Sequence, residues 1–226
     1  MRSGRVARSW PSLIKVGPSS SSSWARRFGV GISRGSPALS LLIARRSLEL
    51  FLRDEIILHP DLSELPDDLV NQGSSFVTIT NHGKLRGCIG STDAQYPLAE
   101  DIARNAISAS SRDYRFPPIS TSELPDIRLE VTILTRPVPL FYQDYDELVG
   151  KLKPGTHGVI LTSETRKGLL LPQVWDRLPD VDRFLEMIAL KAGIPKEDLK
   201  DSPPSVNAFT FEAHHYCELG YLEPGS

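Results

Sequence analysis

The chain has 226 residues, a formal net charge of −2, a hydrophobic fraction of 40% and a charged fraction of 24%. These values are typical of a globular protein with a sizeable core, and no apolar run reaches the roughly 18 residues that a membrane-spanning helix needs. Cys88 and Cys217 lie far apart in the sequence. Their spacing indicates neither a disulfide framework nor a zinc site, and it fits a reducing, cytoplasmic location.

Charge is distributed unevenly along the chain. Residues 1–35 hold seven of the 26 basic residues and no acidic one, which leaves residues 36–226 with 19 basic and 28 acidic residues, a net charge of −9. A body this acidic disfavours binding to nucleic acid, which depends on Lys and Arg. The Arg- and Ser-rich leader is expected to be disordered. It is either a native tail, a transit peptide that would give an organellar location, or an extension from a misassigned start codon.

Order is expected to begin near Ser36, where an N-cap serine precedes Pro37. Apolar residues then recur at three- and four-residue spacing, which predicts an amphipathic helix to about Asp54. The patterns beyond it predict, in chain order, an ordered surface connection (59–73), a strand (76–80), a turn (81–84), a returning strand (85–90), a helix (97–109), a loop (112–118), a capping box (120–123) and a strand (127–133).

The second half is expected to contain a helix (144–152), a turn (154–155), two strands (157–162 and 168–171), a helix (180–192) and a last strand (206–216). Hairpins are frequent and a regular βαβ alternation is missing. The sequence therefore predicts an α+β fold with a mainly antiparallel sheet and flanking helices.

The hexapeptide Leu85–Gly90 is the most informative segment. Its Cys88 is a candidate catalytic nucleophile, because a thiolate near the guanidinium of Arg86 would have a lowered pKa. In a regular strand Arg86 and Cys88 lie on one face, while Leu85 and Ile89 take the other face and suit a core. The alternative, which we favour, is a buried structural cysteine that alkylates slowly in the folded protein.

A second group is a candidate ligand-binding site. Arg86 and Arg115 would clamp a carboxylate or phosphate of a ligand, and Gly87 and Gly90 would let the backbone approach it closely. Under this interpretation the hexapeptide and the loop of residues 112–118 line one cleft. Asp113 either belongs to this pocket or pairs with an arginine and fixes the loop.

The histidines and the remaining carboxylates give weaker signals. His214 and His215 are adjacent in an expected strand, so they face opposite sides and cannot share a metal ion. His157, in a constrained setting between glycines, is kept as a candidate ligand-binding residue. No spacing matches a zinc site or a phosphate-binding loop, so no metal is predicted and no cofactor is indicated. Glu130 is expected to be solvated or ion-paired.

Taken together, these segments resemble the AMMECR domain family, whose prokaryotic members are called AmmeMemoRadiSam system protein A. The most specific match combines LRGCIG at 85–90, RFPP at 115–118 and LPQV at 171–174. Two departures concern Ser108–Ser111, where the family has small apolar residues and an aromatic, and Trp175, which follows LPQV directly where the family first carries a glutamate.

The resemblance covers residues 36–222, identified as one AMMECR-like domain behind the leader. It implies two unequal subdomains, with the hexapeptide near their junction, and partnership with a Memo-like protein and a radical SAM protein. It implies no defined reaction. Two hypotheses therefore stay open: an enzyme or enzyme component that acts beside those partners through a cleft at the hexapeptide, and a non-catalytic module that binds a ligand or a partner protein there.

Overall fold

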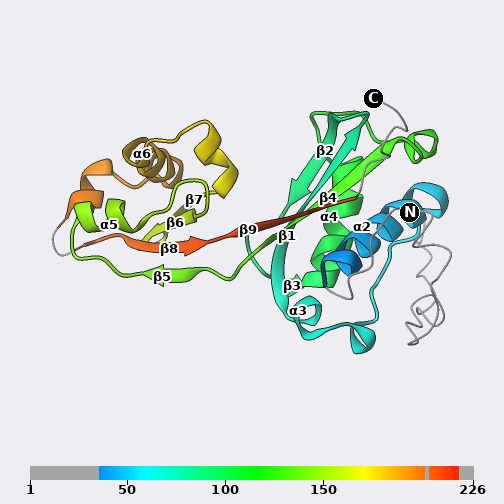
Figure 1. Cartoon of the computed structure of the whole chain (residues 1–226), viewed down its shortest axis with the longest axis horizontal. Coiled ribbons are helices and arrows are strands. Elements are labelled where there is room, and N and C mark those ends of the chain that lie inside the picture. Colours follow the sequence, from blue (N-terminus) through cyan, green and yellow to red (C-terminus); the bar gives the residue numbers. More distant parts are fainter. Residues whose placement is uncertain (1–35, 202–203, 219–226) are drawn as a thin grey trace, which may run out of the picture. The chain divides into compact units, whose positions relative to one another are not determined.

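The computed structural model describes residues 36–201 and 204–218, so the predictions for the leader and for residues 219–222 lie outside the described residues. The described chain forms two unequal units: unit 1 comprises residues 36–133 and 215–218, and unit 2 comprises residues 134–214. Both contain helices and antiparallel strand pairs (Figure 1), which confirms the α+β class. Within the described ranges, no helix is long and apolar enough to cross a membrane.

A five-stranded sheet forms the frame of unit 1. Its strands are β1 (Gln72–Asn81), β2 (Lys84–Gly90), β3 (Tyr96–Pro97), β4 (Ile127–Leu134) and β9 (Ala213–Cys217). The strand order is β2-β1-β4-β9, and the short β3 pairs with the beginning of β1. The predicted hairpin is confirmed, because β1 and β2 pair antiparallel across the turn at His82 and Gly83.

Helices cover one face of this sheet. They are α2 (Ser36–Asp54), α3 (Asp67–Val70) and α4 (Leu98–Ser111), accompanied by the 3₁₀ turns η1 (Leu62–Glu64) and η2 (Thr121–Glu123). Helix α4 packs directly on β1 and β2, and α2 packs on α4. Val77 and Ile79 of β1 are fully buried in this core, together with Ile102 of α4 and Leu48 of α2. The apolar spacing along each element therefore selects the face that is buried.

The segment of residues 59–73 is more structured than the sequence predicted. It contains η1 and α3, and β1 already begins at Gln72. Leu69 of α3 is fully buried in the core of unit 1. The leucines of this segment stand between prolines and acidic residues, so their spacing does not indicate a helix of several turns, although the burial of Leu69 fixes the path of the segment.

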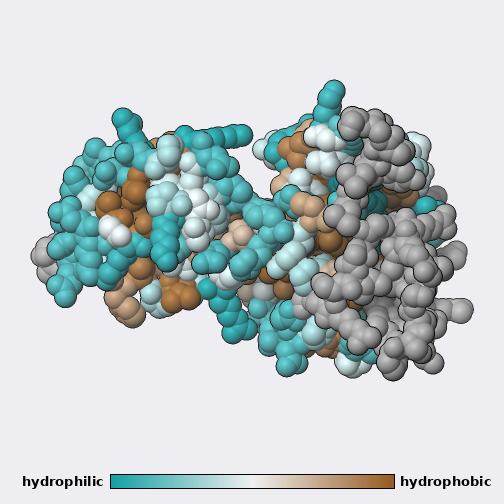
Figure 2. Space-filling model, in the orientation of Figure 1, coloured by the Kyte–Doolittle hydropathy of each residue, from teal (hydrophilic) through white to brown (hydrophobic). Residues whose placement is uncertain are grey.

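Unit 2 contains a four-stranded sheet of order β5-β8-β6-β7 in which all pairs are antiparallel. Its elements are β5 (Val138–Leu140), α5 (Tyr145–Lys151), β6 (Gly158–Ser163), β7 (Arg166–Leu170), η3 (Pro172–Asp176), α6 (Val181–Ala192), η4 (Lys196–Lys200) and β8 (Asn207–Phe211). Helix α6 packs on β6 and β7, and the rings of Trp175 and Phe184 stack 3.6 Å apart. Where α5 and α6 lie, Figure 2 shows a mostly hydrophilic surface with small hydrophobic patches.

The last predicted strand, residues 206–216, is wrong as a single element. It is interrupted at Glu212, so that β8 belongs to the sheet of unit 2 and β9 to the sheet of unit 1. Alternation of side chains continues through both strands, and it cannot reveal that the pairing partner changes. Consequently the last predicted strand supplies one strand to each of the two sheets.

Candidate functional site

The β1–β2 hairpin carries a bulge at the hexapeptide. Ile79 pairs with Gly87, but the next residue, Thr80, pairs with Leu85, which leaves Arg86 as an extra residue in β2. Leu85 therefore shares a face with Cys88, whose partner is Thr78. The prediction that Arg86 and Cys88 lie on one face, with Leu85 in the core, is wrong, and Leu85 is 44% exposed. A bulge inserts one residue and so reverses the alternation beyond it.

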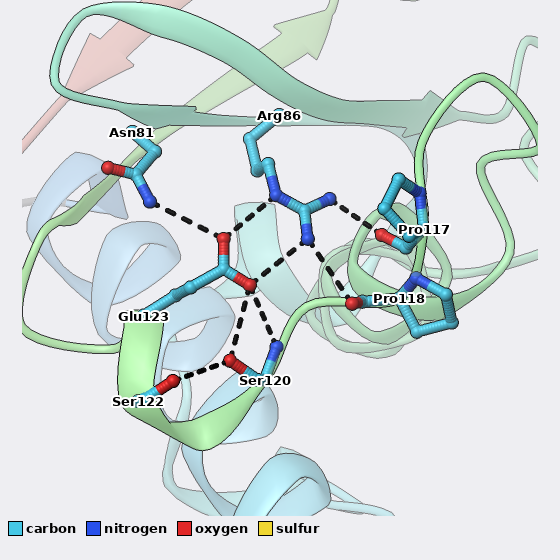
Figure 3. Close-up of polar contacts among 7 residues, drawn as sticks. All are labelled: Asn81, Arg86, Pro117, Pro118, Ser120, Ser122 and Glu123. Carbon is cyan, nitrogen blue, oxygen red and sulfur yellow. Dashed lines mark hydrogen bonds and ion pairs between the residues drawn. The ribbon is translucent and has the colours of Figure 1, made fainter.

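Arg86 contacts the chain through its whole guanidinium group (Figure 3). Its Nε and Nη2 donate to the carboxylate of Glu123 at 2.8 and 3.0 Å. Its Nη1 and Nη2 also donate to the carbonyls of Pro117 and Pro118 at 2.6 and 3.2 Å. Hydrogen bonding from Arg86 is the main reason that the pKa of Glu123 lies below its ordinary value. Arg86 thus joins β2 to the loop and to η2 by charge-assisted hydrogen bonds.

Glu123 itself belongs to the predicted capping box. Its carboxylate accepts the backbone N–H of Ser120 at 2.9 Å and the amide of Asn81 at 3.4 Å. The sequence pattern identified this cap, but it gave no sign that Arg86 would use the same carboxylate. Glu123 is therefore the residue that sequence reasoning missed at this place.

Asp113 fixes the other side of the hexapeptide. Its carboxylate accepts the backbone N–H of Cys88 at 2.9 Å and two hydrogen bonds from the Arg115 side chain at 2.9 and 2.7 Å. Arg115 also donates to the carbonyl of Cys88 at 3.3 Å. These hydrogen bonds, chiefly those from the Arg115 side chain, hold the pKa of Asp113 well below its ordinary 3.8 despite burial of the carboxylate.

This pairing caps an edge strand. β2 is at the edge of its sheet, where a backbone N–H and a carbonyl would otherwise lack partners. Asp113 and Arg115 supply an acceptor and a donor to Cys88, as a neighbouring strand would. The loop-fixing interpretation of Asp113 therefore describes the structure, with Arg115 as the arginine.

Cys88 is only half-buried, and its Sγ accepts a hydrogen bond from Thr78 Oγ1 at 3.3 Å. Packing accounts for both glycines beside it. A Cβ at Gly87 would lie 2.1 Å from the carbonyl oxygen of Ala109 in α4, and a Cβ at Gly90 would lie 2.2 Å from the ring of Phe76. The close approach that these glycines permit is therefore a packing contact within the protein, of β2 with Ala109 and with Phe76.

His157 belongs to unit 2, whereas all the other candidate residues belong to unit 1. Its Nδ1 accepts the backbone N–H of Lys153 at 3.3 Å, and its carbonyl accepts the indole N–H of Trp175 at 2.6 Å. Partial burial lowers the pKa of His157 below its ordinary value. These contacts indicate a structural role for His157, which directly precedes β6.

The loop of residues 112–118 presents an exposed aromatic side chain. Tyr114 is 95% exposed, although both its neighbours in sequence take part in the Asp113–Arg115 pair. Arg112, Pro117 and Pro118 are exposed as well. The loop is thus a basic and aromatic surface on a fixed backbone, which the sequence indicated only by composition.

Comparison with known proteins places this architecture in a family. The sequence model of the AMMECR1 family matches residues 41–216. The chain belongs to the AMMECR1 family. It is 36% identical to a protein of Methanothermobacter thermautotrophicus over 84% of this chain and 97% of the relative, and 40% identical to a Methanosarcina mazei protein over 80% and 86%.

A crystal structure supports the same assignment. The uncharacterized protein PH0010 from Pyrococcus horikoshii is similar to this chain with a TM-score of 0.64 and 31% sequence identity. The similarity covers 78% of this AMMECR1-family chain and 88% of the Pyrococcus chain. The resemblance inferred from LRGCIG, RFPP and LPQV is therefore confirmed at the level of the family and its fold.

Proposed function

We propose that unit 1 of this AMMECR1-family protein is a non-catalytic binding module that docks a partner protein through the loop of residues 112–118. The observation that supports this most directly is the exposure of Tyr114 on a loop whose backbone is fixed. The Asp113–Arg115 pair attaches the loop to Cys88, and Arg86 holds the carbonyls of Pro117 and Pro118.

The groups that suggested an anion-binding pocket are engaged within the protein. Arg86 is paired with Glu123, and the Arg115 side chain is paired with the buried Asp113. A ligand carboxylate or phosphate would have to displace these internal carboxylates, which already bind the arginines in two-point contacts. This cost favours a module that displays the loop over an enzyme that clamps an anionic substrate.

Tyrosine and arginine are the residue types that contribute most often to protein–protein binding energy. A fixed loop loses little conformational freedom when it binds, so more of the contact energy becomes affinity. Arg112 and the half-exposed Arg115 also make the loop locally basic on a body with a net charge of −9. The complementary partner surface is an apolar pocket for Tyr114 that is bordered by carboxylates.

The partners that the resemblance implies, a Memo-like protein and a radical SAM protein, are the first to test. We propose that docking of the partner takes place in the cytoplasm, which agrees with the two free cysteines of the described chain. Any substrate of such a complex would be bound by the partner proteins and not by this chain.

Tyr114→Ala is expected to raise the Kd for one of these partners at least about tenfold, because it removes the exposed aromatic anchor. Isothermal titration calorimetry with the Memo-like and radical SAM proteins of the same organism measures this. Phe141→Ala is the matched control, since Phe141 is an 81% exposed aromatic residue of unit 2. An unchanged Kd for Tyr114→Ala would contradict docking through this loop.

An enzymatic role of Cys88 is the second candidate. It is favoured by the half-buried setting of Cys88, whose sulfur has a hydroxyl donor in Thr78. Under the binding-module proposal, Cys88 alkylates more slowly than a free thiol in the folded protein and Cys88→Ser leaves partner binding intact. Iodoacetamide labelling followed by peptide mass spectrometry tests this. Rapid labelling of Cys88 in the native state would make the enzyme hypothesis the better one.

A further inference from the structure

A second group of functional side chains lies on neighbouring strands β4 and β9 of unit 1. It consists of Glu130, Thr132, His215 and Cys217, named here the β4–β9 cluster. Ile127, Leu129 and Val131 of β4 are buried in the core with the helices, so the alternate residues of β4 belong to the opposite face of the sheet. The cluster is therefore separate from the hydrophobic core.

Glu130 is the acceptor at the centre of this cluster. Its Oε1 accepts the hydroxyl of Thr132 at 3.3 Å and lies 3.2 Å from Nδ1 of His215, while its Oε2 accepts the thiol of Cys217 at 3.2 Å. Among the described residues, no lysine or arginine pairs with it. Arg128, on the same strand, directs its Nη1 to the carbonyls of Pro125 and Ile127 instead.

These contacts determine the tautomer of His215. A carboxylate can only accept, so Nδ1 must carry a proton to face Oε1 at 3.2 Å. Thr132 Oγ1 also lies 3.0 Å from Nδ1, and because its one proton goes to Glu130 its oxygen accepts from Nδ1 as well. In the neutral ring Nε2 is then the nitrogen with a free lone pair. The side chain of His215 is 40% exposed.

We propose that the β4–β9 cluster is a second site, in which Nε2 of His215, oriented by Glu130 and Thr132, accepts a proton or hydrogen bond from a ligand hydroxyl. When a proton moves, it passes from the ligand oxygen to Nε2 and leaves an imidazolium ion beside the Glu130 carboxylate. A carboxylate that accepts Nδ1–H fixes the tautomer and the orientation of the ring, so that Nε2 keeps its free lone pair. This inference does not depend on the docking loop.

The thiol of Cys217 is a hydrogen-bond donor in this site. Cys217 is exposed as a residue, but partial desolvation of its thiol, and after it the neighbouring Glu130, raises the pKa of Cys217 to about 11, so the sulfur stays protonated at neutral pH. A protonated thiol is not the nucleophile of the site. It occupies Oε2 of Glu130, and Oε1 is left for Thr132 and His215.

Glu130→Gln tests the site in the full chain, because it keeps the size of the side chain and removes its charge. Long-range ¹H–¹⁵N NMR of the wild type at pH 8 should show His215 with its proton on Nδ1. Titration with phenol should move the Nε2 resonance of His215, whereas anisole, which lacks the proton, should not. In Glu130→Gln the affinity for phenol should fall about tenfold. His214, its neighbour in sequence, is the internal control.

Cys217 provides a readout that does not depend on any ligand. Its alkylation by iodoacetamide should be faster in Glu130→Gln than in the wild type, because the carboxylate that raises the thiol pKa is gone. A proton on Nε2 in the wild type would overturn the proposal. So would an equal response of His215 to phenol and anisole, or a phenol affinity that is unchanged in Glu130→Gln.

Discussion

Asp113→Asn is expected to lower the free energy of unfolding of unit 1 by about 2–3 kcal/mol. The carboxylate has only 3% of its side chain exposed and receives hydrogen bonds from Cys88 and Arg115 on both of its oxygens. An asparagine side chain has one oxygen, so its NH₂ group would face a donor on the other side. The N–H of Cys88 at the edge of β2 and the side chain of Arg115 in the loop would then compete for one acceptor oxygen.

The pH dependence of this effect has a definite sign. In the folded protein the pKa of Asp113 lies below the ordinary 3.8 of the unfolded chain. The ionised carboxylate therefore contributes its full stabilisation above about pH 4, and this stabilisation is lost as the pH falls toward the pKa of the folded protein. The difference in stability between the wild type and Asp113→Asn should therefore be largest near neutrality. It should shrink as the pH is lowered below about 4.

Chemical denaturation followed by circular dichroism measures this difference, and hydrogen exchange locates it. The amide of Cys88 and its neighbours in β2 should exchange faster in Asp113→Asn, because Asp113 is the acceptor of that amide. Asp126→Asn is the control, since Asp126 is an exposed acid close by in the sequence. A variant as stable as the wild type at neutral pH would show that the ion pair contributes nothing net.

Local signals predicted the longer helices well, although they missed the short helix α3. The N-cap at Asp180 and the glycine at Gly193, which has a φ of 70°, bound α6 where the sequence indicated. Helix α2, Ser36–Asp54, also has the predicted bounds. Caps and apolar periods act within one or two turns, so a single sequence contains most of the information.

Strand partners were less accessible from the sequence. The split of residues 206–216 into β8 and β9 depends on which strands lie beside them, and those strands come from distant parts of the chain. The bulge at Arg86 is a similar case, because a register shift between two strands leaves no mark in the alternation of either one.

At the candidate site, sequence reasoning left the pairing of Asp113 with an arginine as one of two alternatives, and it did not predict the partner of Arg86. Arg86 and Arg115 were expected to face a ligand, whereas the structure pairs them with Glu123 and Asp113. The Asp113–Arg115 pair is two residues apart and was open to prediction as a local contact. The Arg86–Glu123 pair spans 37 residues and depends on how the loop folds back.

Gly87→Ala is expected to destabilise unit 1 by about 3 kcal/mol or more. An added Cβ would lie 2.1 Å from the carbonyl oxygen of Ala109 and 3.1 Å from its carbonyl carbon. Both atoms belong to the backbone of α4, which cannot move aside as a flexible side chain could. Either α4 shifts away from the sheet or β2 does, and each movement disturbs the core around Ile79.

Gly150→Ala is the matched control for this substitution. Gly150 lies in α5 of unit 2, and an added Cβ there would meet no atom within 4 Å. Alanine also favours the helix more than glycine does, so this variant should be as stable as the wild type or up to about 1 kcal/mol more stable. Urea denaturation of both variants measures the contrast. If Gly87→Ala unfolded at the same urea concentration as Gly150→Ala, the close contact between β2 and α4 would be disproved.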